Sequence, residues 1–213
     1  AYLSQKARKM LDEAGWPECQ ISVSNSLDER LIQNLFLQGA QIDMFGVGER
    51  MITAKSEPVF GGVYKLTAVE NDKGEIIPKI KCSENVEKIT IPHFKKVYRL
   101  YNRDNGKAIA DYMTVHDEVV DENEPLMLFD PYATWKTKNV CNFEARELLV
   151  PVFLNGKKVY QSPTLKDIQA YCKQQVNTLW DEIKRFDNPQ TYYVDLSQKL
   201  WDIQQELLRK NRN

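Results

Sequence analysis

The sequence has few cysteines, and their spacing fits neither a metal site nor a disulfide framework. Its 213 residues contain four cysteines, Cys19, Cys82, Cys141 and Cys172, which form no CxxC pair or other metal-ligand spacing. A chain this long can build a core without disulfides. We therefore interpret the cysteines as reduced thiols that pack as small apolar groups. We expect a cytoplasmic protein in which this segment binds no metal.

The sequence also lacks an excess of positive or negative charge. Lys and Arg number 29 against 30 Asp and Glu, so the formal net charge is −1. A chain with this balance has no net positive potential to attract a polyanion, and we therefore expect no nucleic-acid partner. No apolar run approaches the roughly 20 residues of a membrane span, and no secretory signal is recognised at the start. With a hydrophobic fraction of 42%, these absences predict a globular protein with no membrane partner.

Familiar catalytic motifs are absent as well. No serine stands in a GxSxG motif, and the two histidines, His93 and His116, have no companion at metal-ligand spacing. A catalytic histidine needs a positioned partner, and the sequence offers none that can be named. We interpret both histidines as ordinary surface or packed side chains, and we predict no catalytic residue in this segment.

The sequence does contain a stretch, Ser24 to Thr53, with two turns that each follow a strand-like run. The N–H groups that open a helix have no intrahelical acceptor and carry the positive end of the helix dipole, which suits a phosphate group. In α/β barrels a phosphate commonly lies on loops at the carboxyl ends of the strands. We predict that the two turns bind the phosphate of a sugar phosphate through Asn25, Ser26, Gly46, Val47, Gly48 and Glu49.

One such turn alone is weak evidence, because tight turns need glycine for purely structural reasons. The third glycine of the dinucleotide fingerprint and a Walker-type lysine are both missing. The phosphate interpretation depends on the presence of two turns on consecutive strands, and a purely structural turn stays open as the alternative. Glu49 would repel a phosphate through its side chain, so its contact should come from its backbone N–H. Arg50 or Thr53 can add side-chain donors.

Helix and strand patterns alternate up to about residue 70. The spacing of apolar residues predicts a helix over 2–14 and strands over 20–24 and 41–45. Between these strands a helix is predicted, opened by a capping box of Ser26 with Glu29 and ended by Gly39. This order is typical of an α/β barrel or a doubly wound sheet. We expect residues 1–70 to form the last strands and helices of an α/β barrel, with the phosphate-binding loops.

Residues 71–213 are predicted to form an α+β region of hairpins that ends in a pair of helices. A strand is expected over 61–70, directly before this region, and further strands over 76–82, 97–101, 107–113, 126–129 and 147–153, with Asn105-Gly106 as a hairpin signal. Thr164 with Asp167 predicts a capped helix with a buried apolar face. A last helix is expected from about Leu196, and Trp180 and Trp201 are predicted to lie in the core.

Several long motifs resemble those of nicotinate phosphoribosyltransferases, and the resemblance extends over nearly the whole chain. They are VSNSLDE (23–29), QGAQIDMFGVGERMITA (38–54), GGVYKL (61–66), PKIKCSENVEKITIP (78–92), KKVYRLY (95–101) and NPQTYYVDLSQKLW (188–201). The resemblance implies the C-terminal part, less than half, of such an enzyme, with the N-terminal domain and first barrel strands elsewhere. It also implies the type II phosphoribosyltransferase fold, an irregular α/β barrel with an added α+β part.

The resemblance further implies an activity. The family transfers a phosphoribosyl group from phosphoribosyl pyrophosphate to nicotinate, giving nicotinate mononucleotide and pyrophosphate, with coupled ATP hydrolysis and with Mg²⁺ assisting the pyrophosphate. Family members are usually homodimers with sites at the subunit interface. By position, the 5′-phosphate loops of the family fall on Asn25-Ser26 and on Gly46 to Glu49. The histidine that the family phosphorylates is not assigned to His93 or His116.

Two expectations follow for the isolated chain. Half a barrel would lack the strands that face the substrates and would expose unpaired strand edges, so we expect no turnover by residues 1–213 alone. A non-catalytic assembly or dimerisation domain, in which the same segments only pack, stays open as the alternative function.

Overall fold

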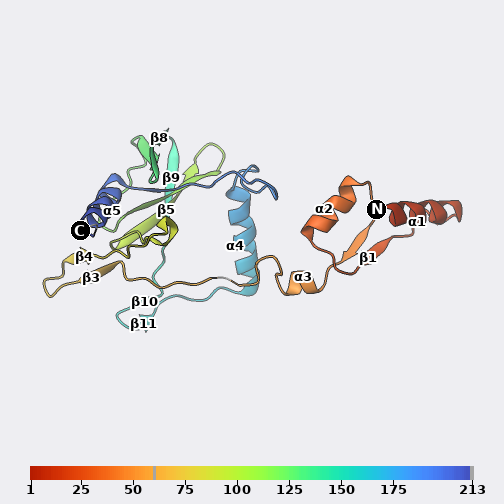
Figure 1. Cartoon of the computed structure of the whole chain (residues 1–213), viewed down its shortest axis with the longest axis horizontal. Helices are drawn as coiled ribbons and strands as arrows, with labels where there is room; N and C mark the ends of the chain where they lie inside the picture. Colours follow the sequence, from red (N-terminus) through yellow and green to blue (C-terminus); the bar gives the residue numbers. More distant parts are fainter. Residues whose placement is uncertain (60, 212–213) are drawn as a thin grey trace. The chain divides into compact units, whose positions relative to one another are not determined.

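A computed structural model describes residues 1–59 and 61–211, and it divides the chain into two compact units, Ala1–Val63 and Tyr64–Asn213. Both mix helices with strands, so the predicted α/β class is confirmed at that level (Figure 1). The division near residue 70 stays a prediction about domains. No helix within the described ranges is long and apolar enough to cross a membrane.

The first unit alternates helices with two short strands. Its elements are α1 (Tyr2–Glu13), β1 (Ser22–Ser24), α2 (Glu29–Leu37), β2 (Met44–Gly46) and α3 (Glu49–Ile52). β1 and β2 pair in parallel, which places their carboxyl ends at the same edge. Gly15 (φ 83°) and Gly39 (φ 72°) follow α1 and α2 in the left-handed conformation, which is usual for a residue directly after a helix and agrees with the predicted role of Gly39.

The predicted capping box at the start of α2 was wrong. The helix begins two residues later than expected for an N-cap at Ser26, and Asp28 is the N-cap residue. Its side chain accepts a hydrogen bond of 2.8 Å from the Leu31 N–H. Asp28 has the extended backbone that an N-cap needs, whereas Ser26 has a left-handed backbone (φ 51°). The sequence signal failed because an aspartate two residues along competes for the same role.

The second unit is built around a four-stranded sheet in the order β12-β6-β5-β9. Its strands are β5 (Lys95–Asn102), β6 (Ala108–Val115), β9 (Phe143–Glu147) and β12 (Val194–Leu196), and only β12 pairs in parallel. The hairpins are β3 (Ala68–Glu70) with β4 (Ile76–Pro78), β7 (Leu126–Asp130) with β8 (Ala133–Val140), and β10 (Phe153–Leu154) with β11 (Lys157–Lys158). The helices are η1 (Val86–Lys88), α4 (Leu165–Thr178) and α5 (Gln198–Lys210).

Two hairpins with a glycine turn were predicted, and so was β7, for which a strand was expected over 126–129; β3 and β4 are shorter than the strands expected over 61–70 and 76–82. The β5–β6 and β3–β4 hairpins are confirmed, with Gly106 and Gly74 at positive φ in their turns. The strand predicted over 147–153 was wrong, because β9 ends at Glu147. The last helix, predicted from about Leu196, is confirmed as α5 but begins at Gln198, after β12. β8 was not predicted.

The core of the second unit lies against the sheet in two clusters. One contains Phe143 with buried residues of β5, β6, β7 and β8: Tyr98, Leu100, Ala110, Tyr112, Leu128 and Val140. The other contains Val115, Leu196 and Leu200, with Trp201 packed against it. Trp201 therefore borders the core as predicted, and α5 packs its apolar side against the parallel pair of β6 and β12.

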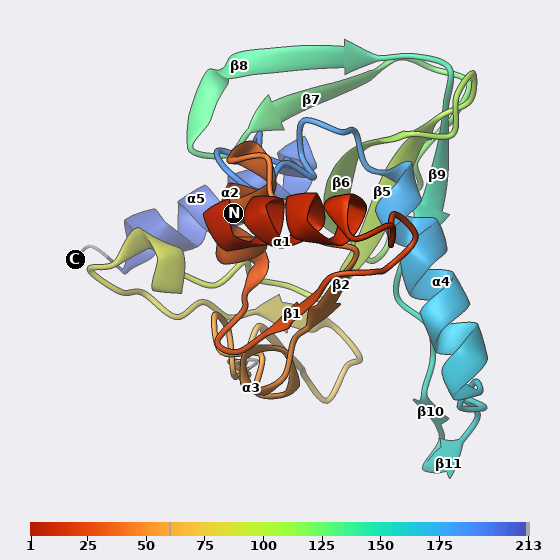
Figure 2. The same ribbon diagram turned by 90° about the vertical axis from the view of Figure 1, so that its right-hand side faces the viewer.

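The region of α4 differs from its prediction on two points: the apolar face of the helix is exposed, and Trp180, which was predicted to lie in the core, follows the helix and is 40% exposed. The capping box of α4 is confirmed, since Thr164 accepts from the Asp167 N–H and the Asp167 carboxylate accepts from the Thr164 N–H. Its predicted buried face, however, is exposed: Ile168, Tyr171 and Val176 each keep more than two fifths of their surface. Figure 2 shows α4 standing out from the sheet. An amphipathic pattern predicts a face that can be buried, but it does not say what covers that face.

Candidate phosphate site and a second cavity

The pairing of β1 with β2 brings the two predicted phosphate turns together. Ser24 lies opposite Gly46 at the end of the parallel pair, so each chain leaves its strand at the same edge. The turns border a hollow of about 270 Å³, lined by Asn25, Ser26, Leu27, Gly46, Gly48, Glu49, Arg50 and Lys55. Five of the six predicted residues therefore line one hollow, and Val47 is outside its lining.

The backbone of the two turns explains part of their composition. Asn25 and Ser26 both have left-handed backbones, with φ of 86° and 51°, a region that asparagine tolerates better than most residues. A Cβ at Gly46 would lie 3.1 Å from the Ser24 Cβ, so glycine permits the close approach of the two strand ends. A Cβ at Gly48 would meet nothing within 4 Å. The lack of a side chain at Gly48 therefore leaves open space at the hollow, and the packing of the protein does not require glycine there.

The helix that follows the second turn is too short to carry much of a dipole. α3 has four residues, and the Gly48 carbonyl already accepts from the Met51 and Ile52 N–H groups, both at 3.1 Å. The N–H groups of Glu49 and Arg50 come before these two hydrogen bonds and, like the first N–H groups of any helix, have no acceptor within the helix. An anion here would depend on these N–H groups and on nearby cations rather than on a long helix dipole.

Two cations at the hollow are each paired with a carboxylate. The Arg50 guanidinium lies 2.8 Å from the Asp28 carboxylate, and the Lys55 ammonium lies 3.2 Å from the Glu49 carboxylate. Ion pairs at this level of exposure contribute about 0–1 kcal/mol each. A phosphate dianion can therefore replace these carboxylates at small cost.

The side-chain donors differ in part from the expectation. Arg50 lines the hollow as predicted. The Thr53 hydroxyl instead donates to the Glu49 carbonyl at 2.7 Å and so supports α3. Lys55 was missed, because nothing in its local sequence distinguishes it from a surface lysine; the turn after α3 places it at the hollow.

The structure brings the two histidines together, although no spacing in the sequence pairs them. The rings of His93 and His116 stack with centroids 5.8 Å apart, and the Phe94 ring lies 5.1 Å from that of His116. In the described part of the chain, no group of three or more His, Cys, Asp or Glu residues could hold a metal ion. We assign no ligand role to either histidine.

A second feature is a buried carboxylate beside a cavity of about 210 Å³ in the second unit. Asp195 on β12 is 4% exposed and lines this cavity together with Asp130 and Lys138. Its Oδ1 atom is buried without a hydrogen-bond partner among the described residues. Burial, followed by the nearby Asp130 carboxylate, raises the pKa of Asp195 to about 6. The charged form of this residue therefore opposes folding.

We predict that Asp195→Asn stabilises the protein at pH 8 but not at pH 4. The folded pKa is raised above the unfolded value, so the folded state binds the proton more tightly, and stability is lost as pH rises through about 6. Removing the charge should raise the free energy of unfolding at pH 8 by about 2 kcal/mol. Urea denaturation at both pH values measures this change. Asp72→Asn, in the exposed β3–β4 turn, is the control, and equal effects of both variants at pH 8 would contradict the prediction.

Comparison with known proteins gives a consistent result. A family model described as "Nicotinate phosphoribosyltransferase C-terminal domain" matches residues 94–204. Nicotinate phosphoribosyltransferase of Bacillus subtilis is 46% identical over 201 residues, which is 94% of this chain and 41% of the relative. The Caenorhabditis elegans protein of the same name is 31% identical, over 99% of this chain and 38% of the relative. The chain thus spans about two fifths of the length of the curated relatives it matches.

A solved structure supports the fold. The crystal structure of human nicotinic acid phosphoribosyltransferase superposes with a TM-score of 0.66 at 22% identity, and the match covers 97% of this chain and 38% of the human chain. At this identity the likeness concerns the fold alone.

Proposed function

This chain belongs to the nicotinate phosphoribosyltransferase family, and on that premise we propose that it supplies the 5′-phosphate-binding loops of such an enzyme. The observation that carries the proposal is the parallel register of β1 and β2, which ends with Ser24 opposite Gly46. This register puts both turns at one hollow lined by Gly48 and Arg50.

The whole enzyme would make nicotinate mononucleotide and pyrophosphate from nicotinate and phosphoribosyl pyrophosphate, with coupled ATP hydrolysis. Loss of pyrophosphate builds positive charge on the ribose, and holding the 5′-phosphate fixes the sugar while this happens. The loops are a binding element, because they act on a part of the substrate that does not react. Their contribution is to position the sugar and lower the entropic part of the barrier.

We propose two kinds of donor for the phosphate. Backbone N–H groups of the Gly48–Arg50 turn would bind its oxygens, and Arg50 and Lys55 would exchange their carboxylate partners for the phosphate. This exchange is consistent with the exposure of both ion pairs, whose cationic side chains are 39% and 51% exposed. The Glu49 side chain would turn away once Lys55 leaves it.

Mg²⁺ and ATP, which such an enzyme would use, have no site that we can assign here. The described residues contain no cluster of three or more carboxylate, histidine or cysteine groups to hold a metal ion, so we place no step of the reaction on such a group. The irregular barrel, the homodimer and the cytoplasmic location belong to the same proposal. The N-terminal part that the relatives carry would complete the barrel and supply the catalytic groups.

The proposal predicts that the 213-residue chain binds ribose 5-phosphate without turning over substrates. Binding is followed by the backbone amide resonances of Gly48 and Glu49, and Lys55→Ala should weaken it roughly fivefold, as expected for one exposed charge-assisted contact. Lys73→Ala, in the exposed β3–β4 turn, is the matched control. Absence of binding, or formation of nicotinate mononucleotide by this chain alone, would contradict the proposal.

The alternative, a non-catalytic assembly domain, is favoured by one observation. Leu165 and Tyr171 on α4 and Phe153 and Leu154 on β10 are all more than half exposed, and apolar side chains at this density suit a contact with further polypeptide. The two functions differ in what the loops do. Substitutions at Gly48 should alter sugar-phosphate binding if the loops belong to the enzyme's substrate site, and should not do so if the chain is only an assembly domain.

A further inference from the structure

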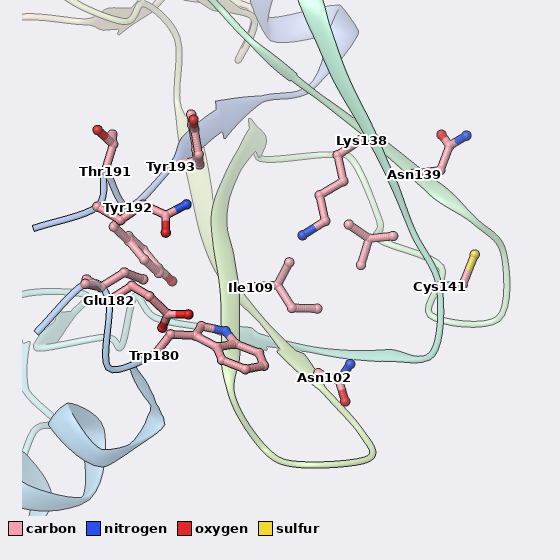
Figure 3. Close-up of a pocket in the computed structure, with 13 residues that line it drawn as sticks. Asn102, Ile109, Lys138, Asn139, Cys141, Trp180, Glu182, Thr191, Tyr192 and Tyr193 are labelled. Carbon is pink, nitrogen blue, oxygen red and sulfur yellow. The ribbon is translucent and has the colours of Figure 1, made fainter.

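A further cavity lies in the second unit, and its lining residues are far in sequence from those of the phosphate hollow. It has a volume of about 380 Å³, within the range of roughly 300–1,000 Å³ that is usual for small-molecule sites. Figure 3 shows its walls: Trp180 and Glu182 come from the segment after α4, Tyr192 and Tyr193 precede β12, and Lys138 comes from β8. None of these residues has a part in the proposed phosphate site.

The aromatic walls of this cavity are fixed by hydrogen bonds from their polar atoms. The Trp180 Nε1–H donates to the Ala108 carbonyl at 3.0 Å. The Tyr192 hydroxyl donates to Asp111 Oδ1 at 2.8 Å, and Asp111 is itself held by Arg99 through contacts of 2.8 and 3.0 Å. Because the polar atoms are already bonded, the rings keep their places when a ligand enters. Binding would therefore lose little side-chain entropy.

The segment that carries these walls is also tied down. The Gln190 N–H donates to the Glu182 carbonyl at 2.9 Å and closes the loop between them. The Lys107 ammonium donates to the carbonyls of Asn177 and Leu179 at 2.9 and 3.2 Å, which fastens the end of α4 to the β5–β6 turn. The cavity is thus a preformed feature of the second unit.

Polar groups face this cavity from opposite sides. Lys138 extends into it from β8, while Glu182 lies across from it beside Trp180 (Figure 3). Within the described ranges, neither charged group forms an ion pair with another residue. The side-chain oxygen Oδ1 of Asn102 accepts from the Asp104 N–H at 2.8 Å, so the side-chain amide nitrogen of Asn102 remains as a donor at the cavity. The site offers an unpaired cation, an amide donor and a carboxylate acceptor around fixed rings.

We propose that this cavity is a binding site for a nucleoside monophosphate, separate from the phosphate hollow of the first unit. The planar base would stack against Trp180 and Tyr192, because ring faces bind bases regardless of their identity. The phosphate would pair with the Lys138 ammonium. Ribose hydroxyls or an exocyclic amine would donate to Glu182. An ordinary phosphate ion would use only the lysine and leave the aromatic walls unoccupied.

AMP is the probe that tests this site on the 213-residue chain. The indole N–H resonance of Trp180, assigned with Trp180→Phe, should shift on addition of AMP because the base lies on that ring. Lys138→Ala should weaken AMP binding roughly tenfold, the usual size of one charge-assisted contact. Lys157→Ala, an exposed lysine on β11 outside the cavity, should leave AMP binding unchanged.

Adenosine completes the design because it lacks the phosphate. It should bind the wild-type chain and Lys138→Ala equally, and as weakly as AMP binds Lys138→Ala. Thermal melting of Lys138→Ala confirms that this exposed substitution keeps the fold. The proposal is overturned if AMP leaves the Trp180 resonance unmoved, if Lys138→Ala binds AMP as tightly as wild type, or if inorganic phosphate competes with AMP at equal affinity. Since the phosphate hollow contains no tryptophan, binding there cannot produce the expected signal.

Discussion

Replacing Gly48 with valine in a full-length enzyme that contains this chain is expected to raise the KM for phosphoribosyl pyrophosphate by roughly 10- to 100-fold, the equivalent of one or two charge-assisted hydrogen bonds. A Cβ at this position meets nothing within 4 Å in the protein, and the residue lines the hollow between the two turns. The added side chain would therefore occupy the space that the proposal gives to the phosphate. The melting temperature should not change, because no neighbour has to move.

The control for this experiment is Gly62→Val, which makes the same chemical change in the same unit. A Cβ at Gly62 also meets nothing within 4 Å, and Gly62 does not line the hollow. Its KM should stay at the wild-type value. If Gly48→Val also keeps the wild-type KM, the second turn is purely structural and the assembly alternative gains support. Gly46→Ala is a poor probe, since its Cβ would press on Ser24 at 3.1 Å and could act through the fold.

The arrangement of the candidate site could be predicted because it depends on a simple rule of topology. Two consecutive parallel strands end at the same edge, so residues directly after them must meet. The sequence places Asn25 and Gly48 in turns directly after two consecutive predicted strands, and the structure brings both to one hollow. Lys55 could not be found in this way, because the direction of the chain after α3 is set by that single helical turn and leaves no pattern in the sequence.

Two of the errors in the fold, at β12 and at α4, have a common physical cause. The turns of the β3–β4 and β5–β6 hairpins each contain a residue with a left-handed backbone, and the glycines at these positions, Gly74 and Gly106, indicate the turns in the sequence. β12 has no such local signal, since it is held by parallel pairing with β6, a strand some eighty residues earlier in the chain. The exposed face of α4 is a related case, because its pattern reports amphipathicity and not the partner. Contacts far apart in sequence determine both features, and one sequence alone does not display them.

Phe143→Ala is expected to destabilise the second unit by about 3–5 kcal/mol, the usual cost of removing a buried aromatic side chain. Phe143 is 0% exposed and packs with Leu100, Tyr112 and Leu128, so it joins the four-stranded sheet to the β7–β8 hairpin. Its loss would leave a cavity that the surrounding strands cannot close, since each is fixed by its own ladder of hydrogen bonds. Urea denaturation followed by far-ultraviolet circular dichroism measures the change.

Phe153→Ala provides the matched comparison, because it removes the same side chain from β10 at a position that is 64% exposed. Its effect on the free energy of unfolding should stay within about 0.5 kcal/mol, as for most surface substitutions. Equal losses for the two variants would mean that the cluster around Phe143 does not dominate the stability of the second unit. A large loss for Phe143→Ala alone would show that the sheet and the β7–β8 hairpin unfold together. The cavity bounded by Lys138 and Trp180 would then exist only while that core is intact, since Lys138 lies on β8 and Trp180 is bonded to β6.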